Sequence, residues 1–308
     1  MNTLVTGGAG FIGSNLVRLL LQEGHTVTVL DNLSSGYRRN LEPFPEVRLI
    51  EGDVRDSAAL DRAARAAEVI FHLAASVGNK RSIEHPIDDS EINVIGTLRV
   101  LEAARAVGAR KVVFSSSAGI FGELKILPIR EDHPAEPISP YGASKLGAEK
   151  LCLAYSKLYP LEVICLRYFN VYGVNQRYDA YGNVIPIFAH RMLQRQAVTI
   201  FGDGEQTRDF VNACDVARAN YQAGMSVGVS GAFNIASGST ITINRLAGLM
   251  RELSGLNAPI EHAAPRPGDV RDSLADVSAA GAAFGYQPSV MIEDGLAEYL
   301  DWAKKEMV

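Results

Sequence analysis

Three glycines near the start of the chain follow a short apolar run and precede a helical pattern. The run contains Leu4 and Val5, and the glycines are Gly7, Gly10 and Gly13. This arrangement predicts a strand, a tight turn and a helix, and the missing side chains let the turn approach a phosphate group closely. The start of the helix also presents free N–H groups to an anion. The segment therefore predicts a dinucleotide site at the first turn of a parallel sheet.

The second predicted strand ends at an acidic residue. Val27 to Leu30 form the strand, and Asp31 follows at its carboxyl end. A carboxylate at this place accepts hydrogen bonds from both ribose hydroxyls of an adenosine and repels a 2′-phosphate. We therefore expect NAD rather than NADP, although the nearby Arg38 and Arg39 would suit a phosphate. The polar turn at 32–36 is expected to line the adenosine pocket.

Charge and composition exclude several classes of function. The 308 residues carry 30 basic and 35 acidic side chains without a basic block, so no nucleic-acid or anionic-membrane partner is expected. Cys152, Cys165 and Cys214 lack the spacing of a metal or redox site and are interpreted as buried thiols in a reducing compartment. The first strand begins at residue 2 or 3, and no run reaches ~18 apolar residues. We expect a cytoplasmic protein without a signal peptide, a membrane span or a metal.

Strands and helices alternate along the first half of the chain. Further strands are predicted at 47–50, 69–71, 112–114 and 162–167, and helices at 57–66, 85–107 and 141–158. Gly108 and Pro160 are plausible ends of the two long helices. The alternation predicts an α/β fold, a doubly wound parallel Rossmann sheet with helices on both faces.

The regular alternation of strands and helices ends at about residue 172. Short strands at 198–201 and 232–235 mix with helices at 184–195, 213–225, 243–254 and 293–305. We expect a cofactor-binding Rossmann domain over 1–172 and a smaller α/β lobe over 173–308 that mainly binds substrate. Some segments of the second part are expected to return to the first domain.

Polar residues follow the predicted strands at the edge where parallel sheets bind their ligands. Asp53 follows the third strand and is expected to face the cofactor. Its alternative role, the N-cap of the next helix, suits Asp56 or Ser57 better. His72 ends the fourth strand and is interpreted as a packed, hydrogen-bonded residue rather than a catalyst. The small residues at 73–75 leave room for a cofactor against the strand end.

A tyrosine and a lysine open the helix predicted at 141–158. Tyr141 and Lys145 stand one turn apart on the same face. A free tyrosine has a pKa of about 10, whereas a nearby ammonium, the helix N-terminus and an oxidised nicotinamide would favour its phenolate. Ser117, the last of three serines after the fifth strand, could hydrogen-bond the same substrate oxygen and share its proton. These three residues predict acid–base chemistry beside a bound NAD.

Taken together, these motifs resemble one family along essentially the whole chain. The family is the extended short-chain dehydrogenases/reductases that act on nucleotide sugars, and the resemblance is nearest to the UDP-glucose (UDP-galactose) 4-epimerases. Its markers are Thr6-Gly7-Gly8-Ala9-Gly10-Phe11-Ile12-Gly13, Asp31-Asn32, Gly52-Asp53, His72-Leu73-Ala74-Ala75, Asn93, Ser115-Ser116-Ser117, Tyr141-x-x-x-Lys145 and Arg167-Tyr168-Phe169-Asn170. The second lobe adds Gln206-Thr207-Arg208-Asp209-Phe210 and Arg266-Pro267-Gly268-Asp269.

The resemblance assigns roles to individual residues. Ser117 assists catalysis, Tyr141 is the base, and Lys145 holds the nicotinamide ribose. Contacts with NAD are implied for Gly7, Gly10, Phe11, Ile12, Gly13, Asp31, Asn32, Ser35, Gly36, Asp53, Val54, Leu73, Ala74, Ala75, Asn93, Ser115, Tyr141, Lys145 and Tyr168. Contacts with the UDP-sugar are implied for Ser117, Tyr141, Asn170, Asn183, Val184, Arg208, Arg266, Asp269 and Ser273. Arg208 and Arg266 would hold the pyrophosphate, which suits the forked donors of guanidinium.

The implied reaction is a transient oxidation of the sugar. Tyr141 takes the proton of O4 while hydride passes from C4 to NAD, and the 4-keto sugar turns over before hydride returns to its other face. UDP-galactose and UDP-glucose are thereby interconverted, and NAD stays bound as a prosthetic group. The resemblance also implies a homodimer through the helices at 85–107 and 141–158.

Departures from the family pattern narrow the expected activity. Dehydratases and decarboxylases of this group carry an acid after the catalytic serine or threonine, whereas Ala118 and Gly119 stand here, which favours plain epimerisation. Phe121 replaces a common tyrosine without touching the core mechanism. Ser273 stands where a bulky residue closes the sugar pocket of some epimerases. UDP-N-acetylglucosamine/galactosamine is therefore an alternative substrate, and another nucleotide-sugar reaction of this NAD-dependent family a further alternative.

Two other classes of function are compatible with a bound NAD. A non-catalytic NAD sensor would be expected to lose Tyr141 or Lys145, and both are present. A net dehydrogenase would release NADH during turnover, which an absorbance measurement would detect.

Overall fold

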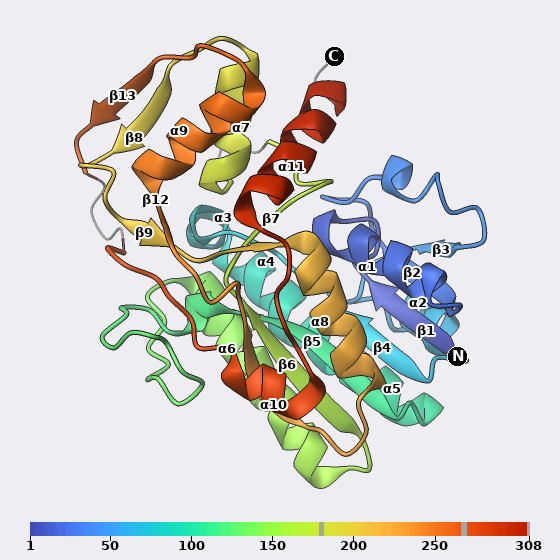
Figure 1. Cartoon of the computed structure of the whole chain (residues 1–308). Helices are drawn as coiled ribbons and strands as arrows, with labels where there is room; N and C mark the ends of the chain where they lie inside the picture. The colour runs from blue at the N-terminus through green and yellow to red at the C-terminus, as the bar shows by residue number, and fades with distance from the viewer. Residues whose placement is uncertain (179–181, 266–269, 307–308) are drawn as a thin grey trace.

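A seven-stranded parallel sheet forms the centre of the computed structural model, which describes residues 1–178, 182–265 and 270–306 (Figure 1). The strand order is β11-β6-β5-β4-β1-β2-β3, and every neighbouring pair runs parallel. The strands are β1 Asn2–Thr6, β2 Thr26–Asp31, β3 Arg48–Glu51, β4 Val69–His72, β5 Lys111–Ser117, β6 Glu162–Tyr168 and β11 Gly231–Ile235. The direction of winding reverses between β1 and β4, which is the place where such sheets bind ligands. The predicted Rossmann fold is confirmed.

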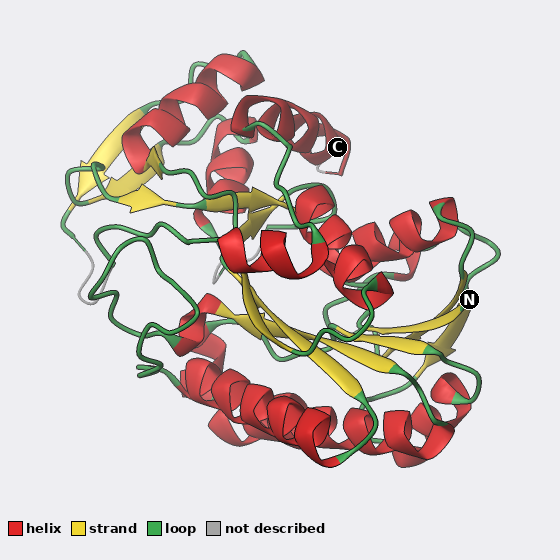
Figure 2. Cartoon of the chain, turned by 60° about the horizontal axis from the view of Figure 1, so that its bottom comes forward, coloured by secondary structure: helices red, strands yellow, loops and turns green. Residues whose placement is uncertain are grey.

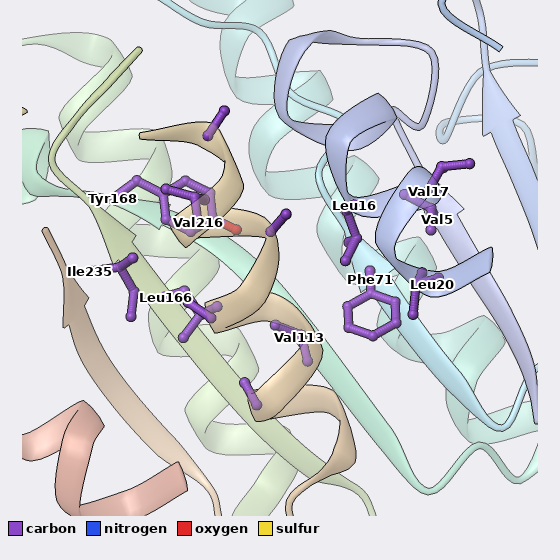
Figure 3. Close-up of a cluster of buried hydrophobic side chains, with 14 of the residues drawn as sticks. Val5, Leu16, Val17, Leu20, Phe71, Val113, Leu166, Tyr168, Val216 and Ile235 are labelled. Atoms are coloured by element: carbon purple, nitrogen blue, oxygen red, sulfur yellow. The ribbon is translucent and has the colours of Figure 1, made fainter. Parts of the chain in front are cut away.

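Helices cover both faces of this sheet, as Figure 2 shows. One layer contains α1 (Phe11–Gln22), α8 (Ala213–Met225) and α10 (Ser278–Phe284), and the other contains α2 (Ser57–Ala64), α5 (Thr97–Val107) and α6 (Pro140–Leu158). Alternate residues of each strand point to opposite faces of the sheet. Val5 packs in the core under the first layer of helices, and Leu4 packs in the core under the second. Because both faces are buried, the central residues of strands such as β1, β4 and β5 form apolar runs. Figure 3 shows Val5, Phe71, Val113 and Leu166 of four strands against Leu16, Val17 and Leu20 of α1 and Val216 of α8.

A helical segment lies at 85–107 as predicted, but it is not one continuous α-helix. It consists of α4 (Pro86–Ser90), a π-helical turn η2 (Glu91–Gly96) and α5, and the short α3 (Asn79–Glu84) precedes it. A hydrophobic period of 3.6 residues predicts only the α-helical state, so the π turn could not be foreseen. Gly108 ends α5 with φ 69°, as predicted.

The fifth strand is longer than predicted and includes all three serines, because the buried Ser115 and Ser116 continue its pairing with β6. The strand predicted at 232–235 amid the second lobe is β11, and it pairs with β6 at the edge of the large sheet. Its preceding helix α8 also covers that sheet. The second half of the chain therefore completes the fold begun by the first.

A second core lies beyond one end of the sheet. It is formed by α7 (Val184–Leu193), α9 (Ile243–Ser254) and α11 (Ile292–Glu306) with the parallel pair β8 (Val198–Phe201) and β13 (Ile260–Ala263). Two further pairs, β7 (Asn170–Tyr172) with β10 (Phe210–Asn212) and β9 (Thr207–Arg208) with β12 (Ile241–Thr242), connect it to the sheet. Short helices at η1 (Arg38–Asn40) and η3 (Ala118–Ile120) complete the elements. No helix in the described ranges is long and apolar enough to cross a membrane.

Candidate active site

The glycine turn between β1 and α1 is shaped so that it admits no side chains. Gly7 has φ 71°, and a Cβ there would lie 2.7 Å from the backbone nitrogen of Ala74. A Cβ at Gly13 would overlap the carbonyl oxygen of Gly7. Gly10 is the N-cap of α1, and no side chain caps this helix. The first N–H groups of α1 therefore face a cradle without side chains, which fits the pyrophosphate of a dinucleotide.

Asp31 lies at the carboxyl end of β2 against this turn. Its Oδ2 accepts a hydrogen bond from the N–H of Ala9 at 2.9 Å, and its Oδ1 accepts one from Leu33 at 2.8 Å. Burial raises the pKa of the Asp31 carboxyl, and these two N–H donors oppose the rise. A Cβ at Gly36 would lie 3.0 Å from both carboxylate oxygens. The Gly36 backbone thus packs closely against the carboxylate, where a side chain would not fit.

Ser117, Tyr141 and Lys145 meet at the carboxyl ends of the strands. Ser117 ends β5, and Tyr141 and Lys145 come from the first two turns of α6, whose N-cap Ser139 accepts from the N–H of Gly142. Tyr141 is hydrogen-bonded to Ser117. The Nζ of Lys145 donates to the carbonyl oxygen of Ser115 at 2.8 Å. The geometry brings together all three residues that the sequence predicts to be catalytic.

Burial shifts the pKa values of Tyr141 and Lys145. Desolvation raises the pKa of Tyr141, and the hydrogen bond to Ser117 opposes that rise. Burial also lowers the pKa of Lys145 to about 8. In the protein residues alone, desolvation of the phenolate outweighs the other contributions to the pKa of Tyr141. The predicted lowering of this pKa includes the charge of an oxidised nicotinamide and stays a prediction.

Comparison with known proteins agrees with this geometry. A model of the NAD dependent epimerase/dehydratase family matches residues 3–236. The chain belongs to the NAD-dependent epimerase/dehydratase family. It is 39% identical to the UDP-glucose 4-epimerase of Mycolicibacterium smegmatis, over 99% of both chains.

Two solved structures of this epimerase/dehydratase family superpose closely on the chain. The UDP-glucose 4-epimerase of Thermotoga maritima with UDP-glucose gives a TM-score of 0.94 at 39% identity, with complete coverage of both chains. The UDP-N-acetylglucosamine 4-epimerase of Methanobrevibacter ruminantium with UDP-N-acetylmuramic acid gives 0.95 at 35% identity, over 99% of each chain.

Several predicted NAD contacts lie around the glycine turn. Leu73 donates its N–H to the carbonyl of Thr6, and Ala74 lies against Gly7. Ala75 follows at the same edge, Phe11 and Ile12 form the first turn of α1, and Ser35 is exposed in the loop after β2. These placements are compatible with the predicted cofactor site of an NAD-dependent family member.

Other residues that the sequence predicts to contact NAD have internal partners in this structure. Asp53 receives hydrogen bonds from Arg55 and from Asn32, and these interactions lower its pKa to about 2. Val54 is buried and leaves no space for a side chain at Gly96. Asp53 therefore forms an internal ion pair with Arg55, and its contact with the cofactor stays a prediction. The N-cap of α2 is Asp56, as the sequence suggested.

Asn93 and Tyr168 are likewise occupied by internal partners. The amide of Asn93 accepts from the N–H of Ser76 at 2.9 Å and donates to the carbonyl of Ser76 at 3.0 Å. The hydroxyl of Tyr168 donates to Oδ1 of Asn220 at 2.9 Å, and burial raises its pKa. Asn93 therefore holds the loop after β4 in shape, because both ends of its amide are used within the protein. Contact of Asn93 and Tyr168 with the cofactor stays a prediction.

Among the described residues predicted to bind the UDP-sugar, several lie in β7, in β9 and at the start of α7. Asn170 in β7 donates to the carbonyl of Asp209 at 3.1 Å, and Arg208 in β9 donates to the carbonyl of Thr207 at 2.7 Å. Asn183 is the N-cap of α7, and Val184 is the first residue of that helix. Ser273 is buried. Arg266 and Asp269 lie outside the described residues.

Asp209 organises this region and was not singled out by the sequence reasoning. It is fully buried and accepts hydrogen bonds from the N–H and hydroxyl of Ser237 and from the N–H groups of Gly238 and Ala275. Burial raises its pKa, and these donors oppose the rise. The carboxylate therefore fixes three segments beside Arg208. Its only signal in the sequence was its place within the Gln206–Phe210 motif.

A buried ion pair behind the serines was also missed. Glu149 of α6 and Arg167 of β6 bind each other, and Ser116 donates to the same carboxylate at 2.6 Å. Glu149 stands four residues after Lys145, so both lie on one helix face. The four-residue spacing of Lys145 and Glu149 was the feature of the sequence that could have indicated a buried role for Glu149.

Proposed function

We propose that this chain is a 4-epimerase that interconverts UDP-galactose and UDP-glucose with NAD as a bound cofactor. The observation that carries the proposal is the meeting of Ser117, Tyr141 and Lys145 beside the glycine turn. The full-length relatives named UDP-glucose 4-epimerase support it. Ala118 and Gly119 follow Ser117 and offer no carboxylate for an elimination.

In this proposal each residue acts on the sugar O4 or on the cofactor. Tyr141 removes the O4 proton and later returns it, and Ser117 holds the same oxygen through a hydrogen bond. Lys145, anchored on the Ser115 carbonyl, is directed toward the nicotinamide ribose. NAD supplies the reversible hydride acceptor at C4, and its positive charge favours the Tyr141 phenolate.

For the nucleotide, we propose that Arg208 and Arg266 neutralise the pyrophosphate, since guanidinium groups form paired, charge-assisted hydrogen bonds with phosphate oxygens. Asn170, Asn183 and Val184 would contact the sugar nucleotide, and Asp269 and Ser273 would complete this side of the site. The pairing of β7 with β10, and the hydrogen bond from Asn170 to the carbonyl of Asp209 next to Arg208, support this arrangement.

A second substrate pair has its own support. Ser273 has a small side chain, and in this proposal a serine there would leave room for a 2-acetamido group. The similar structure from Methanobrevibacter ruminantium is named a UDP-N-acetylglucosamine 4-epimerase. The alternative proposal is therefore the interconversion of UDP-N-acetylglucosamine and UDP-N-acetylgalactosamine.

One coupled assay tests both proposals. Purified protein is incubated with UDP-galactose or UDP-N-acetylgalactosamine, the epimeric product is quantified, and NADH absorbance is followed. We expect epimerisation without net NADH. Steady accumulation of NADH would show a dehydrogenase and reject the epimerase proposal. Ser273→Tyr serves as the specificity variant and should reduce activity on the acetamido sugar more than on UDP-galactose.

We also propose a homodimer through the helical surface of α4, η2, α5 and α6. This surface exposes large apolar side chains, including Ile87 at 75% and Leu158 at 72% exposure, together with Ile95 and Tyr159. Such an apolar surface on a stable fold favours association with a second copy. Light scattering at assay concentration tests the proposal, and a monomer would contradict it. The division into domains and the cytoplasmic location stay predictions.

A further inference from the structure

The short helix α4 buries an acid and leaves an apolar residue exposed. Asp89 is the only buried residue of its five and is 0% exposed, whereas Ile87 of the same helix is 75% exposed. Burying a carboxylate is costly unless it is paired and hydrogen-bonded. Hydrophobic packing alone would select the opposite arrangement. The position of Asp89 therefore calls for a role other than core formation.

Asp89 contacts the helix that carries the catalytic pair. Its Oδ2 accepts a hydrogen bond from the hydroxyl of Ser144 at 2.5 Å, and its Oδ1 has no hydrogen-bond partner within the described part of the chain. Ser144 stands between Tyr141 and Lys145 on α6, and its Oγ also accepts from Asn93 at 3.1 Å. A change at Asp89 is thus transmitted directly to the first turns of α6.

Lys145 is a buried cation without an adjacent anion. It is 2% exposed, and its ammonium donates to a neutral carbonyl oxygen, that of Ser115. No carboxylate of the described ranges lies within ion-pair distance of it. The negative charge of Asp89 raises the pKa of Lys145 and that of Tyr141. Asp89 is thus the carboxylate whose charge reaches both members of the pair.

Other charged groups around α4 do not replace this acid. Lys80 and Glu84 of α3 form an exposed ion pair, and Arg81 of α3 is exposed. Glu91 of η2 pairs with Arg55, while Glu149 of α6 pairs with Arg167. Each of these acids already has a cationic partner or faces solvent, where its field is screened.

We propose that Asp89 is a positioning residue that holds the first turns of α6 through Ser144 and supplies the buried negative charge that balances the Lys145 ammonium. The inference rests on the proposed function for the role of Tyr141 and Lys145. It assigns to α4 a part in catalysis beside that of Ser117, Tyr141 and Lys145.

The first experiment compares Asp89→Asn with Asp88→Asn, an exposed acid on the same helix. In Asp89→Asn, we expect kcat to fall about 10- to 100-fold, because a neutral amide binds the Ser144 hydroxyl less strongly and no longer balances the Lys145 ammonium. The alkaline limb of the pH profile should move to lower pH by about one unit, since loss of the anion destabilises the Lys145 ammonium. Asp88→Asn should match the wild type, and Asp89→Glu should restore the position of the alkaline limb.

The second experiment measures NAD affinity against pH by calorimetric titration, without any sugar. Loss of affinity with rising pH reports the discharge of Lys145, and the decline should begin at lower pH in Asp89→Asn. This measurement remains decisive even if the chain epimerises no UDP-sugar, so failure of the proposed function is distinguishable from failure of this inference.

Stability separates positioning from a merely structural role. Asp89→Asn removes a buried charge with one unpartnered oxygen, so Tm should stay equal or rise while kcat falls. Ser144→Ala removes the hydrogen bond to Asp89 but keeps the Asp89 carboxylate. It should therefore lower kcat with little shift of the alkaline limb of the pH profile. Unshifted profiles of both activity and NAD affinity in Asp89→Asn would overturn the proposal. If that variant does not fold, a wild-type kcat in Ser144→Ala overturns it.

Discussion

Glu149 and Arg167 form a two-point ion pair that joins α6 to β6 behind the serines of β5. The Nη2–Oε1 distance is 2.7 Å and the Nε–Oε2 distance is 3.0 Å, and both side chains are buried. Ser116 donates to Oε2 at 2.6 Å, and Nη1 of Arg167 donates to the carbonyl of Glu131 at 2.8 Å. The helix that carries Tyr141 is therefore fixed to two strands one turn beyond Lys145.

Removing one member of this pair should be strongly destabilising. Arg167→Met leaves the Glu149 carboxylate buried without its cation, and we expect the free energy of unfolding to fall by about 3–5 kcal/mol. Urea titration of the purified variant measures this. Glu136→Gln, which breaks the exposed pair with Lys125, should leave the unfolding curve unchanged because solvent screens that pair. Equal unfolding curves for Arg167→Met and the wild type would contradict the structural role.

Tyr141→Phe should remove the proton acceptor without disturbing the cofactor cradle. We expect kcat to fall by about 10²–10⁴ because the general base is lost, while NAD affinity stays close to that of the wild type. Steady-state kinetics and NAD titration measure the two effects. Tyr299→Phe is the matched control, since its hydroxyl donates to the carbonyl of Gln176 in the second core. A near-normal rate in Tyr141→Phe would exclude Tyr141 as the base.

His72 should make the protein sensitive to acid. Burial, and then the charge of Lys145, lower the pKa of His72 to about 3, and the ring is hydrogen-bonded to Thr6 and Thr97. The unfolded chain therefore binds one more proton than the folded chain between its ordinary pKa of about 6.5 and about pH 3. This contribution to stability is complete above pH 6.5 and is lost as the pH falls.

Thermal denaturation between pH 7 and pH 4 tests the role of His72. In His72→Gln, Tm should depend less steeply on pH than in the wild type, because the amide does not titrate. An identical slope in both proteins would show that other groups control the acid sensitivity. The hydrogen bonds of the imidazole to Thr6 and Thr97 support the interpretation of His72 as a packed residue rather than a catalyst.

Gly13→Ala should damage the cofactor turn. The added Cβ would overlap the carbonyl oxygen of Gly7, so we expect weaker NAD binding and a loss of about 1–3 kcal/mol of stability from overpacking. Gly248→Ala is the control, because the residue is in α9 and a Cβ added there would meet no atom within 4 Å. That substitution should stabilise the helix by about 0.5–1 kcal/mol. Calorimetry with and without NAD compares the two variants.

Arg177 connects the C-terminal helix to the adenosine side of the turn. It donates to Glu306 of α11 and to Oδ1 of Asn40, and Asn40 donates to the carbonyl of Ala9. Its guanidinium also lies 4.1 Å from the ring centre of Tyr37. Arg177→Gln should therefore accelerate the release of NAD and lower stability by about 1–3 kcal/mol. Arg38→Gln, which breaks the exposed pair with Glu51, should retain NAD normally.

NAD retention in these variants is measured as cofactor content after dialysis and as the rate of release into excess charcoal. Equal content in Arg177→Gln and the wild type would show that this connection does not control retention. Loss of NAD from both arginine variants would point instead to a general effect of positive charge near the turn.

Local patterns in the sequence were sufficient for most elements. The apolar run before Gly7 and the helix opened by Tyr141 and Lys145 form as predicted, because period, glycine and proline act over a few neighbouring residues. Contacts between distant segments were not predictable in this way. Nothing around Asp89 or Asp209 in the chain indicates the Ser144 or Ser237 hydroxyls that they bind.

The edge strand β11 of the large sheet has a consequence for the synthesis of the protein. One edge of β6 pairs with β5, and the other edge pairs with β11, which the ribosome produces only after α7, α8 and the intervening strands. A nascent or truncated chain that ends near Tyr172 therefore exposes the unpaired backbone of β6 along Ile164 to Tyr168. Exposed apolar strand edges pair readily with other chains. The cofactor half consequently matures together with the later part of the chain, as one cooperative unit.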